Sequence, residues 1–328
     1  MTQADERPSI SVVIPAHNAE AYITECLEGV FAAGFASHEI VVVDDASQDQ
    51  TAALIQALGI EPFVLSENRG AAGARNAGVA AAKGEIIVFV DADVVVHRDI
   101  RARILDQFRY DDAPAAIFGS YDTAPACPAR VSRVRNLLHH HVHQINAGPM
   151  TSFWTGLGVI RRDVFEALGG FDEGVSMMED IELGMRLHLA CHRIELDPAL
   201  QGTHLKRWTL RSMTRTDLWD RAVPWTQLMS SEAGKKMPEM LNVSTDGKLS
   251  VIAVGLSLLS AIGIVIFPIA SLLSLLISLA LFIYANRGFL GFIRTLDGWV
   301  QTPGAIGVLW LHYLCAGLGY ALVKLGLV

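Results

Sequence analysis

The sequence lacks several features that would assign it to a common functional class. Its 26 Lys and Arg residues are outnumbered by 34 Asp and Glu residues, which leaves a net charge of -8. This balance argues against a general nucleic-acid-binding protein, because such a protein needs a basic surface to displace counterions from phosphates. The four cysteines, Cys26, Cys127, Cys191 and Cys315, lie far apart and form no CxxC pair. Neither a disulfide framework nor a zinc site is predicted, and we expect the chain to work in a reducing compartment.

The first residues also lack the apolar stretch of a secretory signal. Met1–Pro8 is polar and carries Asp5, Glu6 and Arg7 where a signal peptide would need an apolar segment. We therefore expect that the N-terminal domain is not exported. No internal repeat or low-complexity tract is visible in the rest of the chain.

Apolar residues, in contrast, are abundant and concentrated at the C-terminal end. They make up 51% of the chain, and no charged residue occurs from Leu249 to Ala285. A helix of that length could cross about 30 Å of hydrocarbon roughly twice, with Pro268 near the turn. Gly304–Val323 is a third candidate span, flanked by Trp299 and Lys324 as interfacial anchors. The alternative is a water-soluble protein with a very apolar helical core.

Basic residues near these segments predict their orientation. Thr203–Lys236 carries seven Lys and Arg against three Asp and Glu. A two-span hairpin would return Arg287 and Arg294 to the same side, so the positive-inside rule predicts a cytoplasmic N-terminal domain. The segment Arg287–Gly298 mixes apolar residues with these arginines, which is typical of a helix lying in the interface. Lys324 would fall on the opposite side as a minor exception.

The first part of the chain alternates short apolar strands with helices, which is typical of an α/β fold with a mainly parallel sheet. The expected strands are Ile10–Ile14, Ile40–Val43, Pro62–Leu65 and Ile86–Val90, and the helices between them are Ala19–Ala33, Gln50–Leu58 and Ala71–Lys83. Further strands are expected at Ala115–Ser120, Phe153–Ile160 and Ile194–Asp197, with a helix at Ala129–Ile145. Two of the early strands end in carboxylates, and open α/β sheets bind ligands at that edge.

Asp91 and Asp93 follow the apolar strand Ile86–Val90. Side chains two residues apart in an extended strand point to the same side, so the two carboxylates could hold one cation. Mg²⁺ and Mn²⁺ favour few carboxylates combined with phosphate oxygens, and this pair is therefore suited to bring a metal to a diphosphate. The same residues could instead be a polar exit from the strand into a loop.

Two other segments are candidates for nucleotide binding. Asp44 and Asp45 end an earlier strand, and Ser47 follows them. A carboxylate there can accept a hydrogen bond from a base or ribose, although one of the two could instead cap the following helix. Glu67–Gly78 consists largely of small residues that let the backbone approach a ligand, and its Arg75 could contact phosphate or ribose. This loop matches neither a P-loop nor a dinucleotide-binding fingerprint.

Glu179 and Asp180 open the helical stretch Ile181–Ala190. Adjacent carboxylates at that place are stabilised by the helix dipole, which is a purely structural explanation. One of them could instead be a general base that takes a proton from an acceptor hydroxyl.

The segment His204–Trp208 combines a possible metal ligand, a basic phosphate-binding group and an aromatic platform. Basic residues beside a membrane also serve lipid headgroups, so this alternative stays open. His139 and His143 share one face of the helix Ala129–Ile145. For that face we expect contact with the acceptor or the membrane rather than a metal site.

Taken together and in this order, the motifs resemble glycosyltransferase family 2, whose members have the GT-A fold. They cover about the first two thirds of the chain, and their joint occurrence is far more specific than any one of them. The matching segments are Ser11–Glu20, Val43–Ser47, Asn68–Gly78, Asp91–Asp93, Gly169–Glu173 and Glu179–Asp180.

This resemblance implies an inverting single displacement from a UDP- or GDP-sugar, with Mn²⁺ or Mg²⁺ as cofactor. Asp180 would be the base, with Glu179 beside it. Asp93, Asp91 and His204 would hold the metal together with the donor diphosphate. The nucleotide-binding residues would be Pro15, Ala16, Asn18, Glu20, Asp44, Asp45, Ser47, Gly70, Arg75, Asn76, Asp91 and Ala92. The residues near the transferred sugar and the acceptor would be Trp154, Thr155, Gly156, Gly170, Phe171, Asp172, Arg207 and Trp208.

His204–Trp208 is similar to the Gln-x-x-Arg-Trp element of processive polysaccharide synthases, but with His in place of Gln. This departure puts processivity in doubt, and three candidate spans are few for a polymer-conducting channel. A processive synthase remains the alternative within the family.

We therefore predict a GT-A domain at residues 1–208, a basic amphipathic juxtamembrane segment at 209–247 and a membrane domain at 248–328. The membrane domain would have two or three transmembrane helices and an interfacial helix. The expected acceptor is lipid-linked or membrane-embedded, in cell-envelope glycan or glycolipid synthesis, and the expected location is the cytoplasmic membrane. A sugar-nucleotide pyrophosphorylase is an alternative, but the Gly-rich, Arg-containing loop of such enzymes is replaced here by Pro15–Glu20. The presence of both Asp93 and Asp180 speaks against a non-catalytic membrane scaffold.

Overall fold

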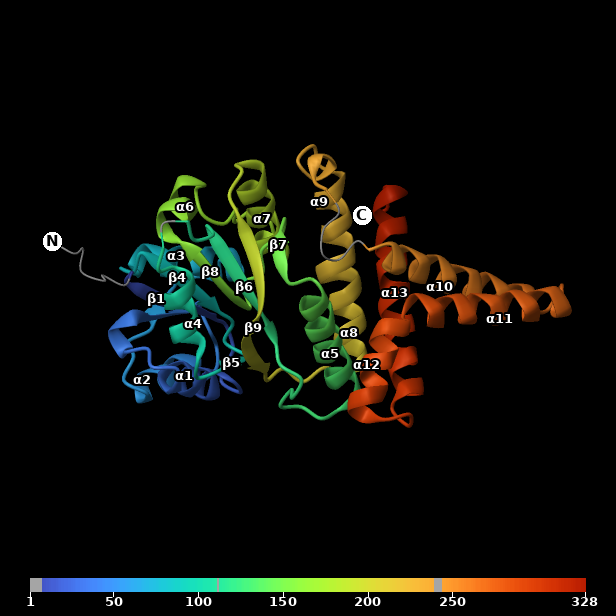
Figure 1. Ribbon diagram of the computed structural model, residues 1–328, viewed down its shortest axis with the longest axis horizontal. Helices are drawn as coiled ribbons and strands as arrows, with labels where there is room; N and C mark the ends of the chain where they lie inside the picture. The colour runs from blue at the N-terminus through green and yellow to red at the C-terminus, as the bar shows by residue number, and fades with distance from the viewer. Residues whose placement is uncertain (1–7, 111, 239–243) are drawn as a thin grey trace. The chain divides into compact units, whose positions relative to one another are not determined.

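The computed structural model describes residues 8–110, 112–238 and 244–328, which form two compact units (Figure 1). The N-terminal unit comprises the described residues up to 127 together with 142–206, and the C-terminal unit comprises 128–141 and 207–328. Helix α5 (Arg130–Ile145) runs from one unit into the other. The division into three consecutive segments at 208 and 247 stays a prediction.

The N-terminal unit is built on a mixed sheet in which nine strands are described, in the order β3-β2-β1-β4-β8-β6-β9-β5, with β7 paired to β9. The strands are β1 (Ile10–Ala16), β2 (Ile40–Asp44), β3 (Phe63–Val64), β4 (Ile86–Val90), β5 (Val94–Val96), β6 (Ala116–Tyr121), β7 (Gly148–Met150), β8 (Leu157–Arg161) and β9 (Ile194–His204). Strands β1 to β4 are parallel, whereas β8 runs antiparallel to β4 and β6. The predicted α/β class is therefore confirmed.

Helices cover both faces of this sheet, because the first strands are apolar on both sides. They are α1 (Ile23–Ala32), α2 (Thr51–Ala57), α3 (Gly70–Ala81), α4 (Ile100–Gln107), α6 (Arg162–Ala167) and α7 (Glu179–Leu189). Val12 and Val88 are buried in the cluster that includes Leu27 of α1. On the other face Val13 meets α3, and Phe89 packs against the ring of Phe165. Strands buried on both faces are typical of the parallel part of an α/β sheet.

The sheet differs from the sequence-based expectation in its later strands. The predicted strand at Ile194–Asp197 continues to His204, because β9 resumes after Pro198 through a register shift opposite β6. Proline normally ends a strand, and such an irregularity is one way past it. The short strands β5 and β7 were not expected, and β8 begins at Leu157 rather than Phe153. The extension of β9 matters most, since it carries His204 to the sheet edge.

The C-terminal unit is helical. Its helices are the first turns of α5, α8 (Leu210–Arg215), the π-helical η2 (Thr216–Ala222), α9 (Val223–Ser230), α10 (Thr245–Gly263), α11 (Pro268–Ala285), α12 (Arg287–Asp297) and α13 (Thr302–Lys324), with a short 3-10 turn η3 (Gly234–Lys236). Three of them, α10, α11 and α13, are long and apolar enough to cross a membrane. Pro268 begins α11, at the predicted turn. The apolar face of α12, with Phe289, Leu290 and Ile293, is buried in the core of the unit, and its interfacial placement stays a prediction.

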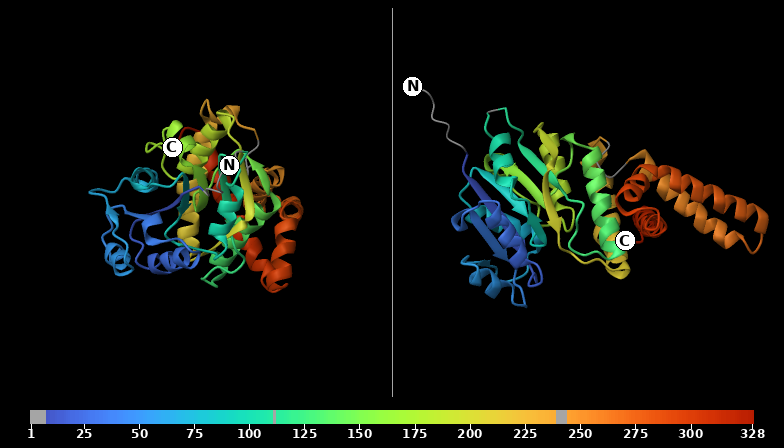
Figure 2. Two further views of the ribbon diagram at one scale, coloured as in Figure 1. Left: turned by 60° about the vertical axis from the view of Figure 1, so that its left-hand side comes forward. Right: turned by 60° about the horizontal axis from the view of Figure 1, so that its bottom comes forward.

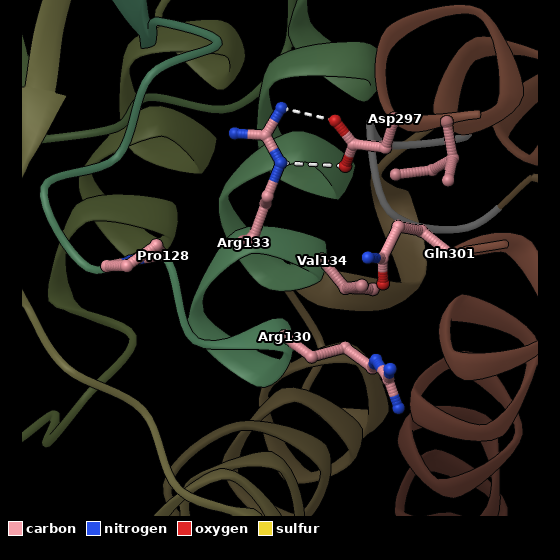
Figure 3. A pocket seen from close by; sticks show the side chains of 7 residues that line it. Pro128, Arg130, Arg133, Val134, Asp297 and Gln301 are labelled. Atoms are coloured by element: carbon pink, nitrogen blue, oxygen red, sulfur yellow. Dashed lines mark hydrogen bonds and ion pairs between the residues drawn. The ribbon is translucent and has the colours of Figure 1, made fainter.

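An ion pair fastens α5 to α12 in this unit (Figure 3). Arg133 donates from Nε to one oxygen of Asp297 at 2.7 Å and from Nη2 to the other at 2.5 Å. The pair lines a pocket of about 400 Å³, whose other lining residues are Pro128, Arg130, Val134, Ile293 and Gln301. The two-pronged geometry fixes the angle between the helices more firmly than a single contact would.

Candidate active site

A buried arginine joins two of the acidic motifs that lie far apart in the sequence. Arg75 on α3 is only 4% exposed, and its Nη2 donates to Asp91 Oδ1 at 2.7 Å. Its Nη1 donates to Glu179 Oε1, also at 2.7 Å. Helix α3 can lie this close to the sheet because its residues are small: a Cβ on Gly78 would stand 2.4 Å from Val13. The guanidinium therefore connects the end of β4 to the start of α7.

Asp180 is the next residue on α7, and it lies at the same edge. Its carboxylate accepts hydrogen bonds from the N–H groups of Ile181 at 2.8 Å and Thr155 at 3.4 Å. The neighbouring Gly156 accepts from the N–H of Asp91 at 3.3 Å, so residues 155–156 link the surroundings of Asp91 and Asp180. Burial, and then the negative charge of Glu179, raise the pKa of Asp180 to about 7. A carboxyl with that pKa can take up and release a proton near neutral pH.

Asp93 has a histidine as its partner. Its Oδ2 lies 3.6 Å from Nε2 of His204, because β5 pairs with β9 so that Val94 stands beside His204. The His204 ring stacks on Tyr121 at 4.3 Å between centroids, and Tyr121 meets Trp154 edge-on at 5.0 Å. Burial alone would raise the pKa of Asp93, but the hydrogen bond and charge of His204 bring it below its usual value. Asp93 is thus held ionised beside an oriented imidazole.

These two side chains fit a cation that is shared with a substrate. In the described parts of the chain no group of three or more His, Cys, Asp or Glu is placed to hold a metal by itself. Mg²⁺ and Mn²⁺ need only one or two protein ligands when a diphosphate and water supply the rest. Asp93 and His204 can be those ligands. Oδ1 of Asp91 accepts a hydrogen bond from Arg75. Asp91 is therefore less available than Asp93 as a metal ligand.

The predicted nucleotide-binding residues of β1 and β2 also lie at the carboxyl edge of the sheet. Pro15 and Ala16 end β1 beside the end of β2. Asp44 accepts from the N–H of Ser47 at 3.0 Å, in the turn that follows β2. It does not cap the next helix, because the N-cap residue of α2 is Gln50. Asp45 is buried and accepts from the N–H of Arg69 at 2.7 Å. Both carboxylates shape the loops of this edge.

The loop after β1 is tied to the loop after β2. The Asn18 N–H donates to Ser47 Oγ at 3.0 Å, and Asn18 adopts a left-handed φ of 50° that asparagine tolerates. Glu20 accepts from the N–H of Gln50 at 3.1 Å. At the start of α3, Gly70 has a φ of 72°, which favours glycine. Ala92 stands between the two aspartates, partly buried.

Asn76 clamps a loop, and its predicted contact with the nucleotide stays a prediction. Its amide donates to Phe171 O and accepts from Phe171 N, both at 2.9 Å. Gly170 has a φ of 74°, and a Cβ there would lie 2.7 Å from the Asn76 oxygen. Arg69 adds an ion pair to Glu173 at 2.6 Å. The segment predicted to meet the sugar is thereby fixed to α3, while Asp172 on it is exposed.

The aromatic residues around His204 were only partly foreseen. Trp154 was predicted, and its ring covers Gly156 so closely that a Cβ on this glycine would lie 2.2 Å from the indole. Tyr121 was missed, because no local sequence signal marks it and it reaches the site only through the sheet order. His143, on the helix face expected to meet the acceptor or the membrane, meets Trp154 edge-on at 5.3 Å and pairs through Nδ1 with Gly119 O at 2.8 Å.

Arg207 and Trp208 belong to the C-terminal unit. Arg207 is exposed, whereas Trp208 is buried, with its N–H donating to Ser132 Oγ at 2.8 Å. The Arg135 guanidinium lies over the Trp208 ring at 4.1 Å. Trp208 is therefore a core residue of its unit, and its predicted contact with sugar or acceptor stays a prediction.

Known proteins similar to this chain are glycosyltransferases. Poly-beta-1,6-N-acetyl-D-glucosamine synthase of Staphylococcus aureus is 26% identical over 236 residues, which are 68% of this chain and 55% of the relative. The glycosyltransferase GlyG of Streptococcus pneumoniae is 33% identical over 123 residues, which are 34% of this chain and 39% of the relative. The chain spans about half the length, or less, of these curated relatives.

A solved structure shows a similar fold. The mannosyltransferase PcManGT from Pyrobaculum calidifontis, in complex with GDP-Man and Mn²⁺, matches with a TM-score of 0.59 at 19% identity, over 97% of this chain and 88% of that one. This likeness confirms the predicted GT-A fold. The family model for glycosyl transferase family 2 matches residues 11–169, which contain β1 to β8. Residues 11–169 of this chain therefore form a glycosyl transferase family 2 domain.

Proposed function

We propose that this chain transfers a sugar from a nucleotide-sugar to an acceptor hydroxyl by a single inverting displacement in which Asp180 is the general base. The observation that carries the proposal is the raised pKa of Asp180, about 7, on a carboxyl that Arg75 and Glu179 place at the same sheet edge as Asp91. Asp180 takes the hydroxyl proton as the acceptor oxygen attacks the sugar carbon. The nucleoside diphosphate leaves from the opposite side.

Glu179 serves Asp180 indirectly. It is buried and its oxygen is engaged by Arg75 at 2.7 Å, so it is not free to accept a proton from a substrate. Its charge instead raises the pKa of Asp180, while the guanidinium keeps the buried pair of motifs together. Glu179 is therefore a positioning residue in this mechanism.

A divalent cation, Mn²⁺ or Mg²⁺, would be held by Asp93 and His204. When bound, such a cation neutralises the charge that develops on a leaving diphosphate. The protein's own part is to keep Asp93 ionised and the His204 ring oriented, through the pairing of β5 with β9 and the stack on Tyr121. Asp91, paired with Arg75, supports the backbone turn that carries Asp93.

The ends of β1 and β2, with Pro15, Asp44 and Asp45, would hold the nucleoside, and the loop clamped by Asn76 would border the sugar. The names of two similar proteins suggest which donors to test first. The relatives include an N-acetyl-D-glucosamine polymer synthase and a mannosyltransferase with bound GDP-Man. The first name supports a donor of N-acetylglucosamine and the second a GDP-sugar donor, within the proposed class of UDP- and GDP-sugars.

The proposed acceptor is lipid-linked or membrane-embedded, and the proposed location is the cytoplasmic membrane with the N-terminal unit facing the cytoplasm. Three long apolar helices support attachment to a membrane. The seven basic residues in Thr203–Lys236 support the orientation. The likeness to a polymer synthase favours a processive reaction as the second candidate, and product length separates the two.

The test uses the full chain in detergent with Mn²⁺, a panel of UDP- and GDP-sugars and a lipid extract as acceptor. We expect transfer to one lipid product, detected by mass spectrometry, and its loss in Asp180→Asn with donor binding retained. Asp163→Asn is the matched control, because this carboxylate is 77% exposed at the side chain and outside the site. Full activity of Asp180→Asn, or no binding of any nucleotide-sugar, would overturn the proposal.

A further inference from the structure

Helix α13 runs alongside the helix formed by α8, η2 and α9 (Figure 1). Near its middle, His312 Nδ1 pairs with Asp217 at 2.9 Å. Towards its end, Lys324 Nζ donates to Ser230 Oγ at 2.9 Å. Gly319 permits close approach between these points, because a Cβ there would lie 2.5 Å from Ala222. The second half of α13 thus shares its whole course with residues 217–230.

That partner helix is too charged to lie in hydrocarbon. Its charged residues are Arg211, Arg215, Asp217, Asp220 and Arg221. Asp217 is buried between His312 and Arg135, but Arg211 and Arg221 are exposed. An exposed charge in the middle of a bilayer costs several kcal/mol. Because α13 packs along this helix, an α13 that crossed a bilayer would carry these charges into the hydrocarbon. Helix α13 therefore cannot cross a bilayer while the two helices stay packed.

The hairpin of α10 and α11 projects crosswise to α13 in Figure 1 and in the right-hand view of Figure 2. Its base is covered: Trp310 donates to Ser257 at 3.1 Å, and the rings of Tyr313 and Phe282 meet at 6.0 Å. Beyond this level both helices carry exposed apolar side chains, among them Leu259, Ile262 and Ile269. Ser260 and Ser274 join them there by a hydrogen bond of 2.7 Å.

The tip of the hairpin is apolar and exposed. The turn Ile264–Phe267 has no polar side chain, and Val265 is 86% exposed. The N–H groups of Ile266 and Phe267 both donate to Gly263 O, at 3.0 and 2.9 Å, and Pro268 has no N–H to satisfy. A turn that meets its own hydrogen-bonding needs is stable in lipid, whereas a loop that reaches water normally carries polar residues.

The projecting part is short. At about 1.5 Å per residue, α10 extends roughly 12 Å from Ser257 to Val265, and α11 extends roughly 22 Å from Phe282 back to the turn. The hydrocarbon core of a bilayer is about 30 Å thick. At the end of α11, Arg287 lies over the exposed Tyr284 at 4.3 Å, and at the far end of α12 Arg294 lies over the exposed Trp299 at 4.6 Å. Such pairs are typical of the headgroup level.

We propose that this chain attaches to one face of a bilayer: the α10–α11 hairpin enters the hydrocarbon and returns, and α13 lies along the surface without crossing. Lys324 and the end of α13 are then on the same side as the N-terminal unit, not on the opposite side as three spans would require. This inference rests on the proposed membrane location. It adds the way in which the membrane is engaged.

Labelling with a membrane-impermeant maleimide tests it in sealed vesicles of both orientations. Variants Val265→Cys and Leu327→Cys are made in a Cys127→Ser, Cys191→Ser background. A separate Cys127→Ser protein keeps the exposed Cys191, which reports the side of the N-terminal unit. We expect Leu327→Cys to react on the same side as Cys191. Val265→Cys should react at least tenfold more slowly from either side and fully after solubilisation. Both substituted residues are exposed, so neither change removes a core contact.

Labelling of Leu327→Cys from the side opposite Cys191 would overturn the surface placement of α13. Labelling of Val265→Cys from that opposite side would show that the hairpin crosses. As a second measurement, Val265→Asp should lower the membrane-bound fraction at least tenfold relative to Leu327→Asp, and equal binding of the two would contradict burial of the tip. If the unsubstituted chain stays in the supernatant, the membrane location itself fails, and sugar transfer to soluble acceptors is read separately.

Discussion

The two units bury ionised groups in opposite ways. In the N-terminal unit one cation is shared by two carboxylates, since Arg75 pairs with both Asp91 and Glu179. In the C-terminal unit one carboxylate is shared by two basic groups, since Asp217 pairs with Arg135 at 2.6 Å and with His312 at 2.9 Å.

This difference has a chemical consequence. Burial, and then the negative charge of Glu179, raise the pKa of Asp180 to about 7, because Arg75 alone does not offset them. For Asp217, burial would raise the pKa, but His312 and Arg135 lower it well below the usual range. Where buried carboxylates outnumber the basic groups, a carboxyl can exchange a proton near neutral pH. Where basic groups outnumber the carboxylates, the carboxylate stays ionised. The first arrangement suits chemistry and the second suits structure.

The largest effect is expected when Asp180 loses its carboxylate. Asp180→Asn cannot accept the acceptor proton, and loss of a general base lowers rates by about 100- to 10,000-fold. Steady-state transfer measures the loss, and donor binding by calorimetry should stay unchanged. The control Asp163→Asn keeps full activity. Equal activity in both variants would show that the raised pKa at residue 180 has no catalytic role.

Removing the shared partner should destabilise both units. Arg75→Ala leaves Glu179 buried without its cation, and Asp217→Ala leaves Arg135 without its anion. A broken buried pair costs about 3–5 kcal/mol, so both variants should unfold at clearly lower temperature in detergent. Only Arg75→Ala should also abolish sugar transfer at temperatures at which the variant is still folded. A matching loss of activity in Asp217→Ala at temperatures where it stays folded would break the division into a chemical and a structural site.

The pH dependence should separate the two sites next. Because the pKa of Asp180 is about 7, the base is protonated below that pH, and kcat/KM should fall about tenfold per pH unit below about 7 and level off above it. The pKa of Asp217 is lowered from the ordinary 3.8, so its contribution to stability is present above about pH 4 and is lost only in stronger acid. Activity profiles and thermal unfolding from pH 5 to 9 measure the contrast. A flat activity profile would contradict the poised base.

The smallest effect is expected at the α5–α12 ion pair. Arg133 is partly exposed, with a side-chain exposure of 31%, and such pairs contribute about 1 kcal/mol or less. Arg133→Gln should therefore lower the unfolding temperature slightly and leave donor transfer unchanged. Raising the salt concentration should weaken the native pair in the same sense. A loss as large as that of Asp217→Ala would mean that the pocket beside Asp297 depends on this contact.

Much of the fold was predictable because its signals are local. The strand Ile86–Val90 was predicted with the bounds that β4 has, since five buried apolar residues precede Asp91. The helix α5 was placed within one residue, and the turn before α11 was marked by Pro268. The end of β9 was missed because Asp197-Pro198 is a local stop signal, which the pairing with β6 overrides.

The residues of the site were predicted from sequence motifs, but the contacts between them were not. Asp91, Glu179 and Asp180 were assigned to one site, but the contact of Arg75 with both Asp91 and Glu179 was not predicted. The contact of Asn76 with the loop of Phe171 was not predicted either. A residue's partner depends on which elements pack together, and residue type alone does not reveal it.

By itself the sequence determined the strand–helix alternation, the carboxylates at the strand ends and the charge-free C-terminal stretch. These follow from side-chain chemistry read over a few neighbouring residues. Only the tertiary structure decided that Arg75 bridges to a carboxylate 104 residues away, that His204 stands beside Asp93, and that α13 packs along a charged helix. The physical reason is that burial and pairing set the charge state of such groups, and both come from contacts between segments that are distant in the chain.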